Sequence, residues 1–407
     1  MDDAASDLSL RSVDDVDRVE LVDGVPFILG EDGTYDLELN RFFRECPSMG
    51  VRSLNSVRAY ARDLLTWMRF LDERRAGKCL LQADRQDLIA FHRARRLVAG
   101  RGQITASSWN RSVTALERFY GWAWEEGLVA ATPFVRGPIA ATGRAAPRHA
   151  QRRSGSFREP AARRHDMRFI GMDRFIQFRD VGLRAHSSDG AADPAWRGRN
   201  GERDALFAEF LTATGLRLAE ASSLLPADLP RRDDPLLGDA RSCPVSLPAA
   251  ICKGGKGREI RVPRRLLRRI DDYMAIERAN AVARWRARRG WERVRDPVAV
   301  LEWQSRSALI NVGGTRPSRR RLDVIPPDER ARLMVIGPDD APAEPAQLWL
   351  TDSGGPMRPA AWEATFLRAD ARCRAQGFDL HVTPHMLRHT FAVHMLSLLI
   401  RAHRSAR

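Results

Sequence analysis

The chain has 407 residues, enough for two domains with substantial cores, and carries a formal net charge of +15 with a pI near 10.7. This charge suits a polyanionic partner, because arginine neutralises phosphates and releases their counterions, although a ribosomal or merely Arg-rich protein would share it. Five cysteines without metal-ligand spacing indicate reduced thiols, and without a signal peptide or a bilayer-length apolar run we expect a soluble, cytoplasmic, nucleoid-associated protein with no membrane partner.

Residues 1–34 form an acidic segment with little periodic pattern. Six aspartates and one glutamate fall within the first twenty positions. Such a composition is typical of chain that does not fold by itself. We therefore expect a mobile or loosely docked tail, and one that discourages non-specific contact with nucleic acid.

Residues 35–134 predict a small helical domain. From Ser53 to Leu71 apolar residues recur at helical spacing with arginines on the other face, and further helices are expected over 85–98 and 105–126. The last of these helices is rich in aromatic residues, which ordinary burial preferences assign to the core rather than to base stacking. These aromatic residues are Trp109, Phe119, Tyr120 and Trp122.

Residues 135–166 differ sharply in composition from the chain before them. Arg, Ala, Pro, Gly and Ser dominate, and eight arginines stand against Glu159 and Asp166. A segment this polar cannot fold alone, so it predicts a linker. Its composition leaves two alternatives open, a linker that is inert and merely solvated or a basic segment that follows a phosphate backbone.

A first motif reads T-G-L-R-L-A-E over residues 214–220. Gly215 predicts the end of one helix and Pro226 the end of the next. The second helix would carry Arg217 in its first turn and Glu220 on the same face. By itself this pair could be an ordinary surface ion pair.

Lysine is rare in this chain. Of 67 basic residues only Lys78, Lys253 and Lys256 are lysine. Two of them lie within residues 250–263, where apolar and β-branched residues flank a Gly-Gly turn, which predicts a β-hairpin. An ammonium group can give up a proton and a guanidinium cannot, so a retained lysine suits a proton donor. A hairpin that only touches a phosphate backbone would be served by any cation.

The region between this hairpin and the last motif is less regular. A long Arg-rich amphipathic helix is predicted over 264–289. Residues 292–347 then become rich in Pro and Arg, and we interpret them as an insertion of unknown role. Residues 348–351 predict a short strand, and residues 359–375 predict a helix that leads to the last motif.

The last motif reads T-P-H-M-L-R-H-T-F-A over residues 383–392. Thr383 is a good N-cap and Pro384 suits the first helical position, so we expect a helix to begin here. His385 and Arg388, three residues apart, then lie on one face beside unpaired N–H groups and the positive end of the helix dipole, which favour a phosphate. Taken alone, the motif favours a capped surface helix with two solvated polar residues.

Together and in this order, the two motifs resemble those of the tyrosine recombinases, the phage integrase family of DNA strand-exchange enzymes. In that family TGLRxxE carries the first catalytic arginine, and HxLRHTFA carries a histidine and the second arginine. The segment with Lys253 is similar to the family's GKGxKxR hairpin. The resemblance implies a mainly α fold of two domains: a helical SAM-like core-binding domain over 35–134 and a mixed α+β catalytic domain over 167–407.

The resemblance also implies the chemistry of DNA recombination and integration. A tyrosine oxygen attacks a phosphodiester of double-stranded DNA, forms a 3′-phosphotyrosyl link and releases a 5′-hydroxyl, without ATP, metal or another cofactor. Arg217 and Arg388 would hold the nonbridging oxygens in the transition state. His385 would assist proton removal from the tyrosine or bond a nonbridging oxygen, and Lys253 would protonate the leaving oxygen.

Other residues take supporting roles by the same resemblance. Glu220 would orient Arg217, while Lys256 and Arg258 would contact phosphates of the DNA. His389, inside the last motif, is expected to be structural.

The chain departs from the family after the last motif. There the family has a further histidine or tryptophan in an LLGH segment and then the nucleophilic tyrosine, but this chain stops at Arg407. We therefore expect that the catalytic domain is incomplete at its C-terminus, and residues 397–407 predict no packing helix that could hold a tyrosine. The four tyrosines of the sequence, at positions 35, 60, 120 and 273, all lie upstream.

Two functions of different classes remain. The first is a strand-transferase by ancestry that is inactive alone, its C-terminus lost through truncation, frameshift or an incomplete gene model. The second is a non-catalytic DNA-binding protein that occupies recombination sites, as a homo-oligomer or paired with an intact recombinase that supplies tyrosine in trans. The retained Lys253 and both arginines favour the first. A third reading, an unrelated Arg-rich nucleic-acid binder, requires three motifs to coincide by chance.

Overall fold

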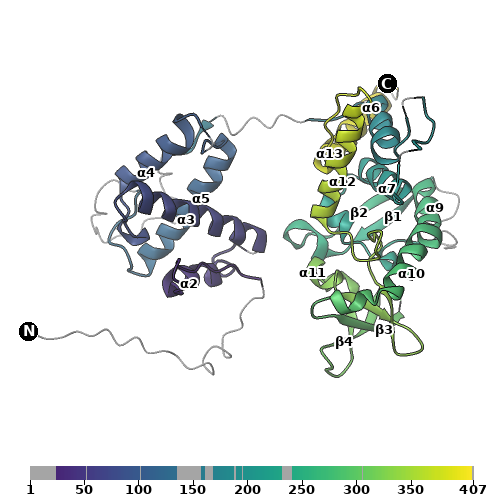
Figure 1. Cartoon of the computed structure of the whole chain (residues 1–407), viewed down its shortest axis with the longest axis horizontal. Helices are drawn as coiled ribbons and strands as arrows, with labels where there is room; N and C mark the ends of the chain where they lie inside the picture. The colour runs from purple at the N-terminus through teal and green to yellow at the C-terminus, as the bar shows by residue number, and fades with distance from the viewer. Residues whose placement is uncertain are drawn as a thin grey trace, which may run out of the picture. The chain divides into compact units, whose positions relative to one another are not determined.

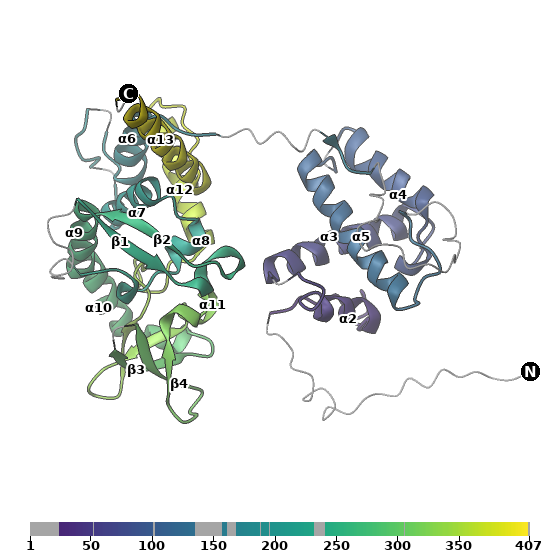
Figure 2. The same ribbon diagram turned by 180° about the vertical axis from the view of Figure 1, so that it is seen from behind.

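The computed structural model describes residues 24–134 except 52 and 101, residues 157–160, and residues 168–405 except 188, 195, 232–240 and 305. The chain divides into two compact units, Met1–His165 and Asp166–Arg407. We call these the N-terminal unit and the C-terminal unit. Figures 1 and 2 show both from opposite sides.

The N-terminal unit is helical, as predicted. Its elements are α2 (Leu37–Glu45), α3 (Leu54–Arg74), the 3₁₀ turn η1 (Leu80–Gln82), α4 (Arg85–His92), which continues as the π-helical η2 (Arg93–Leu97), and α5 (Ala106–Glu125). Three starts are fixed by Asp36, Asp84 and Thr105, whose side chains each accept a backbone N–H of the first turn. The sequence did not predict α2, which is a short helix.

Aromatic side chains fill the centre of this unit. The indole N–H of Trp67 donates to the hydroxyl of Tyr120 at 2.9 Å, and that hydroxyl donates to the carbonyl of Leu80 at 2.7 Å. Trp109 and Phe119 are at most 1% exposed. The prediction that these aromatics belong to the core is confirmed. Their polar ends are satisfied inside the protein, so burial carries no unpaired donor.

Part of the predicted linker packs on the N-terminal unit. Phe157 is buried, and its carbonyl accepts the indole N–H of Trp109 at 2.5 Å. Glu159 forms an ion pair with Arg96 at 2.7 Å. The remainder of that linker, and residues 1–23 of the predicted tail, lie outside the described residues.

The C-terminal unit is built around α7 (Gly201–Thr214), which packs against α13 (Pro384–Ser405), α9 (Arg264–Tyr273) and strand β2 (Arg258–Pro263). Other elements are α6 (Met172–Gln177) with its π-helical continuation η4 (Phe178–Leu183), α8 (Leu218–Ser222), the 3₁₀ turn η5 (Pro226–Asp228), the π-helical η9 (Met274–Arg278), α10 (Ala279–Ala287), the 3₁₀ turn η10 (Gly290–Arg293) and α12 (Pro359–Ala375). The long helix predicted over 264–289 is present as one continuous helix, because the π-helical η9 at its centre joins α9 to α10.

Strand β1 (Ser242–Leu247) pairs with β2 as an antiparallel hairpin, with Leu247 opposite Arg258. The predicted hairpin exists, but the sequence placed its first strand wrongly, because residues 248–257 form the connection. Two 3₁₀ turns lie there, η7 (Ala249–Ile251) and η8 (Lys253–Gly255). Pro244 lies within β1 and disfavours a strand there by sequence, since proline has no backbone N–H to donate to a neighbouring strand.

The predicted insertion folds as a five-stranded sheet with the order β5-β4-β3-β6-β7, in which β3 and β6 are parallel and the other pairs antiparallel. Its elements are β3 (Val298–Gln304), β4 (Ser307–Val312), β5 (Ser318–Arg321), the 3₁₀ turn η11 (Leu322–Val324), α11 (Pro327–Arg330), β6 (Leu333–Ile336) and β7 (Pro342–Pro345). This sheet was not predicted from the sequence, because its strands are short and β7 begins and ends with proline.

One smaller prediction near the end of the chain is wrong. Residues 348–351 form no strand, since Leu350 makes only one isolated bridge, to Pro356. Residues 397–405, where no packing helix was expected, continue α13 in good helix formers without proline or glycine, but residues 397–404 are exposed. Several apolar side chains of this last part face solvent, among them Leu396, Leu398 and Leu399.

The junction between α7 and α13 depends on one glycine. Gly215 ends α7 with a φ of +63°, and a Cβ built on it would lie 2.2 Å from a ring carbon of Phe391 on α13. The backbone conformation and the close approach of the two helices therefore both require glycine. This contact brings the start of α13 against the residues that follow α7.

We expect Gly215→Ala to lower the free energy of unfolding of the C-terminal unit by at least about 2 kcal/mol. The left-handed backbone costs alanine about 1–2 kcal/mol, and displacement of Phe391 adds to that cost. Urea unfolding measures the change. Gly355→Ala is the matched control, because the nearest atom to its new Cβ is 3.6 Å away. Equal destabilisation by the two substitutions would contradict the requirement for glycine at position 215.

Candidate active site

Residues of the two distant motifs line one pocket of the C-terminal unit. Arg217 comes from the junction of α7 and α8, and His385 and Arg388 come from the start of α13. The pocket has a volume of about 520 Å³, and Phe366 and Leu367 of α12 supply apolar parts of its lining. Three of the four predicted catalytic residues therefore share one cavity.

Arg217 lies in extended backbone directly before α8, with φ −72° and ψ 150°, and not inside the first turn as predicted. The helix is also shorter than predicted, because α8 ends at Ser222 and not at Pro226. A single turn cannot be stabilised by its own hydrogen bonds. Its geometry instead depends on the side chain of Glu220.

The Glu220 carboxylate is the anchor of this site. It accepts the backbone N–H and the guanidinium of Arg217, both at 2.8 Å, and two guanidinium bonds from Arg258, at 2.6 and 3.0 Å. Its side chain is only 1% exposed. Burial alone would raise the pKa of Glu220, but the bonds from Arg258 and Arg217 outweigh it and lower the pKa to about 2. The carboxylate therefore stays ionised and holds Arg217 in place.

Arg258 and Lys256 were both predicted to contact phosphates. The guanidinium of Arg258 is instead engaged by Glu220, and it also approaches the sulfur of Cys252 at 3.7 Å. Lys256 is exposed on the connection between β1 and β2. A phosphate contact by either residue stays a prediction.

Lys253 is exposed in the turn η8, directly after Cys252. The contact between Cys252 and Arg258 links this turn to the buried Glu220. Lys253 is not among the residues that line the pocket with Arg217. The predicted general acid therefore lies on a loop that is connected to the site, outside the set of residues that line the cavity.

Arg388 reaches across from α13 to the end of α7. Its guanidinium donates to the carbonyl of Gly215, and the side chain of Thr383 caps α13 by accepting the N–H of Met386 at 3.2 Å. The predicted helix start at Pro384 is confirmed. Burial lowers the pKa of Arg388, and the nearby Arg217 lowers it further, so two cations share this corner.

His385 lies against His389, one turn further along α13. Their Nε2 atoms are 3.0 Å apart, and the ring centroids are 4.4 Å apart. Burial lowers the pKa of His385, followed by the charges of His389, Arg388 and Arg217, so the imidazole is neutral at pH 7. From the sequence, His389 was expected to be only structural. The i, i+4 spacing of the two histidines on a helix was the signal for their contact.

No tyrosine hydroxyl lines the pocket among the described residues. Tyr273, the tyrosine of the C-terminal unit, is buried within the core. Its hydroxyl donates to the carbonyl of Leu348 at 3.3 Å and accepts the N–H of Leu350 at 3.1 Å. Burial raises the pKa of Tyr273, which keeps it protonated. In the described part of the chain, no three His, Cys, Asp or Glu side chains are grouped to hold a metal ion.

Comparison with known families identifies the N-terminal unit. Residues 39–127 match the phage integrase N-terminal SAM-like domain. The predicted resemblance to the phage integrases is thereby confirmed, since the chain carries one of their domains. The predicted mainly α fold, with a helical SAM-like domain and a mixed second unit, is also confirmed. No helix in the described ranges is long and apolar enough to cross a membrane.

Several solved structures are similar to this chain. The XerH site-specific recombinase bound to difH substrate, in a pre-cleavage complex, is 14% identical with a TM-score of 0.45 over 89% of this chain and 72% of that one. The Tn1549 transposon integrase in complex with a circular intermediate DNA is 12% identical, with a TM-score of 0.43 over 83% and 85%. The XerA recombinase is 13% identical, with a TM-score of 0.29 over 88% and 83%. These scores are too low to carry an argument about function, and no curated protein matches the chain.

We expect the stability that Glu220 contributes to depend on pH. Its folded pKa of about 2 lies below the ordinary 4.5, so the contribution is complete above pH 4.5 and is lost as pH falls towards 2. Glu220→Gln should reduce the free energy of unfolding at pH 7 by about 3 kcal/mol. Urea unfolding of both proteins between pH 2.5 and 7 gives this difference.

The control for this measurement is Glu363→Gln, on the exposed side of α12 beside the same pocket. We expect little change in stability there. A loss at Glu220→Gln that stays constant between pH 4.5 and 2.5 would contradict the role of the ionised carboxylate.

We also expect the titration midpoint of His385 to lie below 6.5, because burial, followed by the electrostatic effects of His389, Arg388 and Arg217, disfavours the imidazolium. His389→Gln should raise that midpoint, since it removes one of those effects. NMR titration of the His385 ring proton resonances measures both. A midpoint that is unchanged by His389→Gln would rule out the coupling of the two rings.

Proposed function

We propose that the C-terminal unit activates a DNA phosphodiester for strand cleavage of the tyrosine recombinase type, and that the chain acts in site-specific DNA recombination or integration. The observation that carries the proposal is the convergence of Arg217, His385 and Arg388 on one pocket, with Arg217 fixed by the buried Glu220. The phage integrase domain at residues 39–127 supports the same class. The net charge of +15 suits double-stranded DNA as the partner.

Each residue has a role in this proposal. Arg217 and Arg388 bind the two nonbridging oxygens and stabilise the charge that grows on them as the phosphorus becomes pentavalent. His385, neutral at pH 7, accepts the proton of the attacking hydroxyl or donates to a nonbridging oxygen. Lys253 gives a proton to the departing 5′ oxygen. No metal or other cofactor takes part in these steps as proposed.

Tyr273 is not the nucleophile in this proposal, because it is buried and its hydroxyl is committed to the backbone. A tyrosine carried by another recombinase subunit, either a second copy or a different protein, would satisfy the chemistry. The apolar side chains of Leu218, which is half-buried, and Leu367, which is exposed, lie beside Arg217 and offer a surface for such a segment.

The same observation favours a second candidate function, namely a DNA-binding protein that occupies recombination sites without cutting them. In this candidate the arginines bind a phosphate but no bond is broken. We place the core-binding domain at residues 35–134, a backbone-following linker at 135–166 and the catalytic domain at 167–407 in both candidates. Lys256 contacts a phosphate in both, and both act in the cytoplasm on the nucleoid.

The two functions differ in whether the pocket activates phosphorus, and a small nucleophile tests this without a tyrosine. Duplex DNA that the chain binds is first selected from a randomised pool. Hydrogen peroxide is then added, so that its oxygen attacks phosphorus while the 5′ oxygen departs. We expect a nick at a defined position with a 5′-hydroxyl end, and Arg217→Ala or Arg388→Ala should reduce nicking about 100-fold or more.

The matched control is Arg358→Ala, because Arg358 is exposed and lies outside the pocket. This variant should nick like the wild type. Binding of the selected DNA is measured in parallel for every variant. Binding without any nicking above the Arg217→Ala level would overturn phosphodiester activation and leave the second candidate.

A further inference from the structure

The inserted sheet has no charge excess that would draw it to DNA. Residues 292–347 contain nine arginines and nine aspartates or glutamates, so their net charge is zero within a chain of +15. Its core, which includes Val300, Ile310 and Leu322, also takes in Leu225, three residues after the end of α8. The insertion therefore packs on the segment that follows α8, which carries Glu220.

One side chain joins the insertion to the segment that carries Glu220. Arg330 of α11 is fully buried and forms an ion pair with Asp228 at 2.5 Å. Its remaining donors bond the carbonyls of Ser223 at 3.2 Å, Leu322 at 2.5 Å and Ile325 at 3.0 Å. All five guanidinium hydrogens thus have acceptors, on both sides of the junction. Such a satisfied buried ion fixes its partners in one arrangement.

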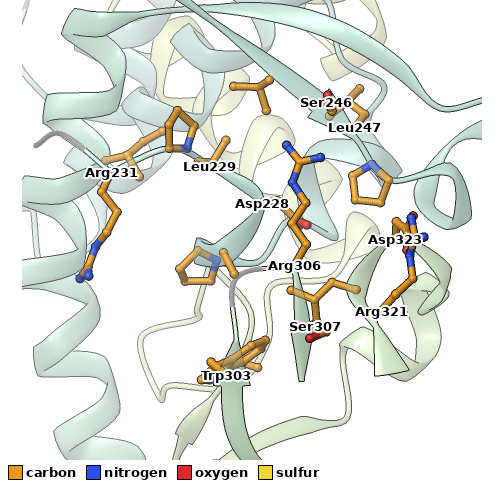
Figure 3. A pocket seen from close by; sticks show the side chains of 18 of the residues that line it. Asp228, Leu229, Arg231, Ser246, Leu247, Trp303, Arg306, Ser307, Arg321 and Asp323 are labelled. Atoms are coloured by element: carbon orange, nitrogen blue, oxygen red, sulfur yellow. The ribbon is translucent and has the colours of Figure 1, made fainter. Parts of the chain in front are cut away.

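The insertion also reaches the loop that carries Lys253. The turn η11 lies against η7, two residues before Lys253. Beside this contact a groove of about 1650 Å³ separates the insertion from β1. Figure 3 shows Arg321 and Asp323 on the insertion side of the groove, and Ser246 and Leu247 on the other. The turn η11 therefore supports η7 beside this groove.

We propose that the insertion positions Lys253 relative to Arg217, and that Arg330 is the residue that transmits this positioning. Ser223 and Asp228 continue the chain from Glu220, and Leu322 and Ile325 bound the turn that supports η7. Arg330 thus connects the segment that fixes the phosphate-binding arginine with the loop of the proton donor. Arg330 touches no reacting atom and is a positioning residue. This inference rests on the proposed activation of a phosphodiester.

The chemistry of the leaving group separates this role from plain stability. When hydroperoxide oxygen bonds to phosphorus, the bond to the 5′ oxygen breaks and Lys253 supplies the proton that this oxygen takes up. A substrate with sulfur in place of that bridging oxygen releases a thiolate, which needs no proton. Displacement of Lys253 therefore slows the oxygen substrate and spares the sulfur substrate.

The test compares both substrates, with hydrogen peroxide as the nucleophile, in the full chain. Arg330→Met alone would strand a buried aspartate, so the variant used is Arg330→Met with Asp228→Leu, which removes both charges together, and its urea unfolding at pH 7 is measured beside wild type to show that it is folded. We expect nicking of the oxygen substrate to fall about 10-fold or more while nicking of the sulfur substrate stays within about twofold of wild type. Lys253→Met should give the same pattern. Equal loss on both substrates, or loss on neither, overturns the proposal.

Arg332→Met is the matched control. Arg332 also lies in the insertion, and within the described residues its guanidinium bonds the carbonyl of Asp296, which belongs to the insertion too, so both substrates should react as with wild type. A second measurement does not depend on nicking. Hydrogen exchange in residues 249–255 should quicken in the paired variant and stay unchanged in α8, and unchanged exchange in 249–255 overturns the proposal. A wild-type chain that nicks neither substrate refutes the proposed function instead.

Discussion

The buried carboxylate of Glu220 is the constraint on which the candidate site depends. It satisfies the backbone N–H of Arg217, so it stabilises the one-turn helix α8, and it satisfies two guanidinium groups from different elements. Loss of one partner would leave a buried charge without compensation. The free-energy cost of that unpaired charge exceeds the net stabilisation that the intact ion pair provides. The position of Arg217, the start of β2 and the approach to the Lys253 loop are therefore set together.

The second constraint is the contact at Gly215. Only a residue without a side chain permits the left-handed end of α7 and the approach of Phe391 at the same point. The carbonyl of Gly215 then accepts the guanidinium of Arg388. The glycine of the first motif thus determines where the arginine of the last motif is placed, which explains how segments distant in sequence form one pocket.

Local signals in the sequence were sufficient for much of this arrangement. The cap at Thr383, the helix end at Gly215 and the aromatic core of the N-terminal unit follow from side-chain chemistry within one or two turns. The inserted sheet was missed because its strands are four to seven residues long and pair across the insertion. The partner of Arg258 was missed for a related reason, since its contact with Glu220 spans 38 residues and has no local signature.

The charge of the finished site explains what it can bind. Arg217, Arg258 and Arg388 stand around a single carboxylate, and Lys253 lies on the adjoining loop. Glu220 neutralises only one of these charges, and the mutual repulsion of Arg217 and Arg388 contributes to lowering the pKa of Arg388. An anion placed between the two arginines relieves that repulsion and accepts hydrogen bonds from both. In the proposed reaction a phosphodiester would gain further in the transition state, because the additional negative charge would develop on the oxygens that the two arginines are proposed to contact.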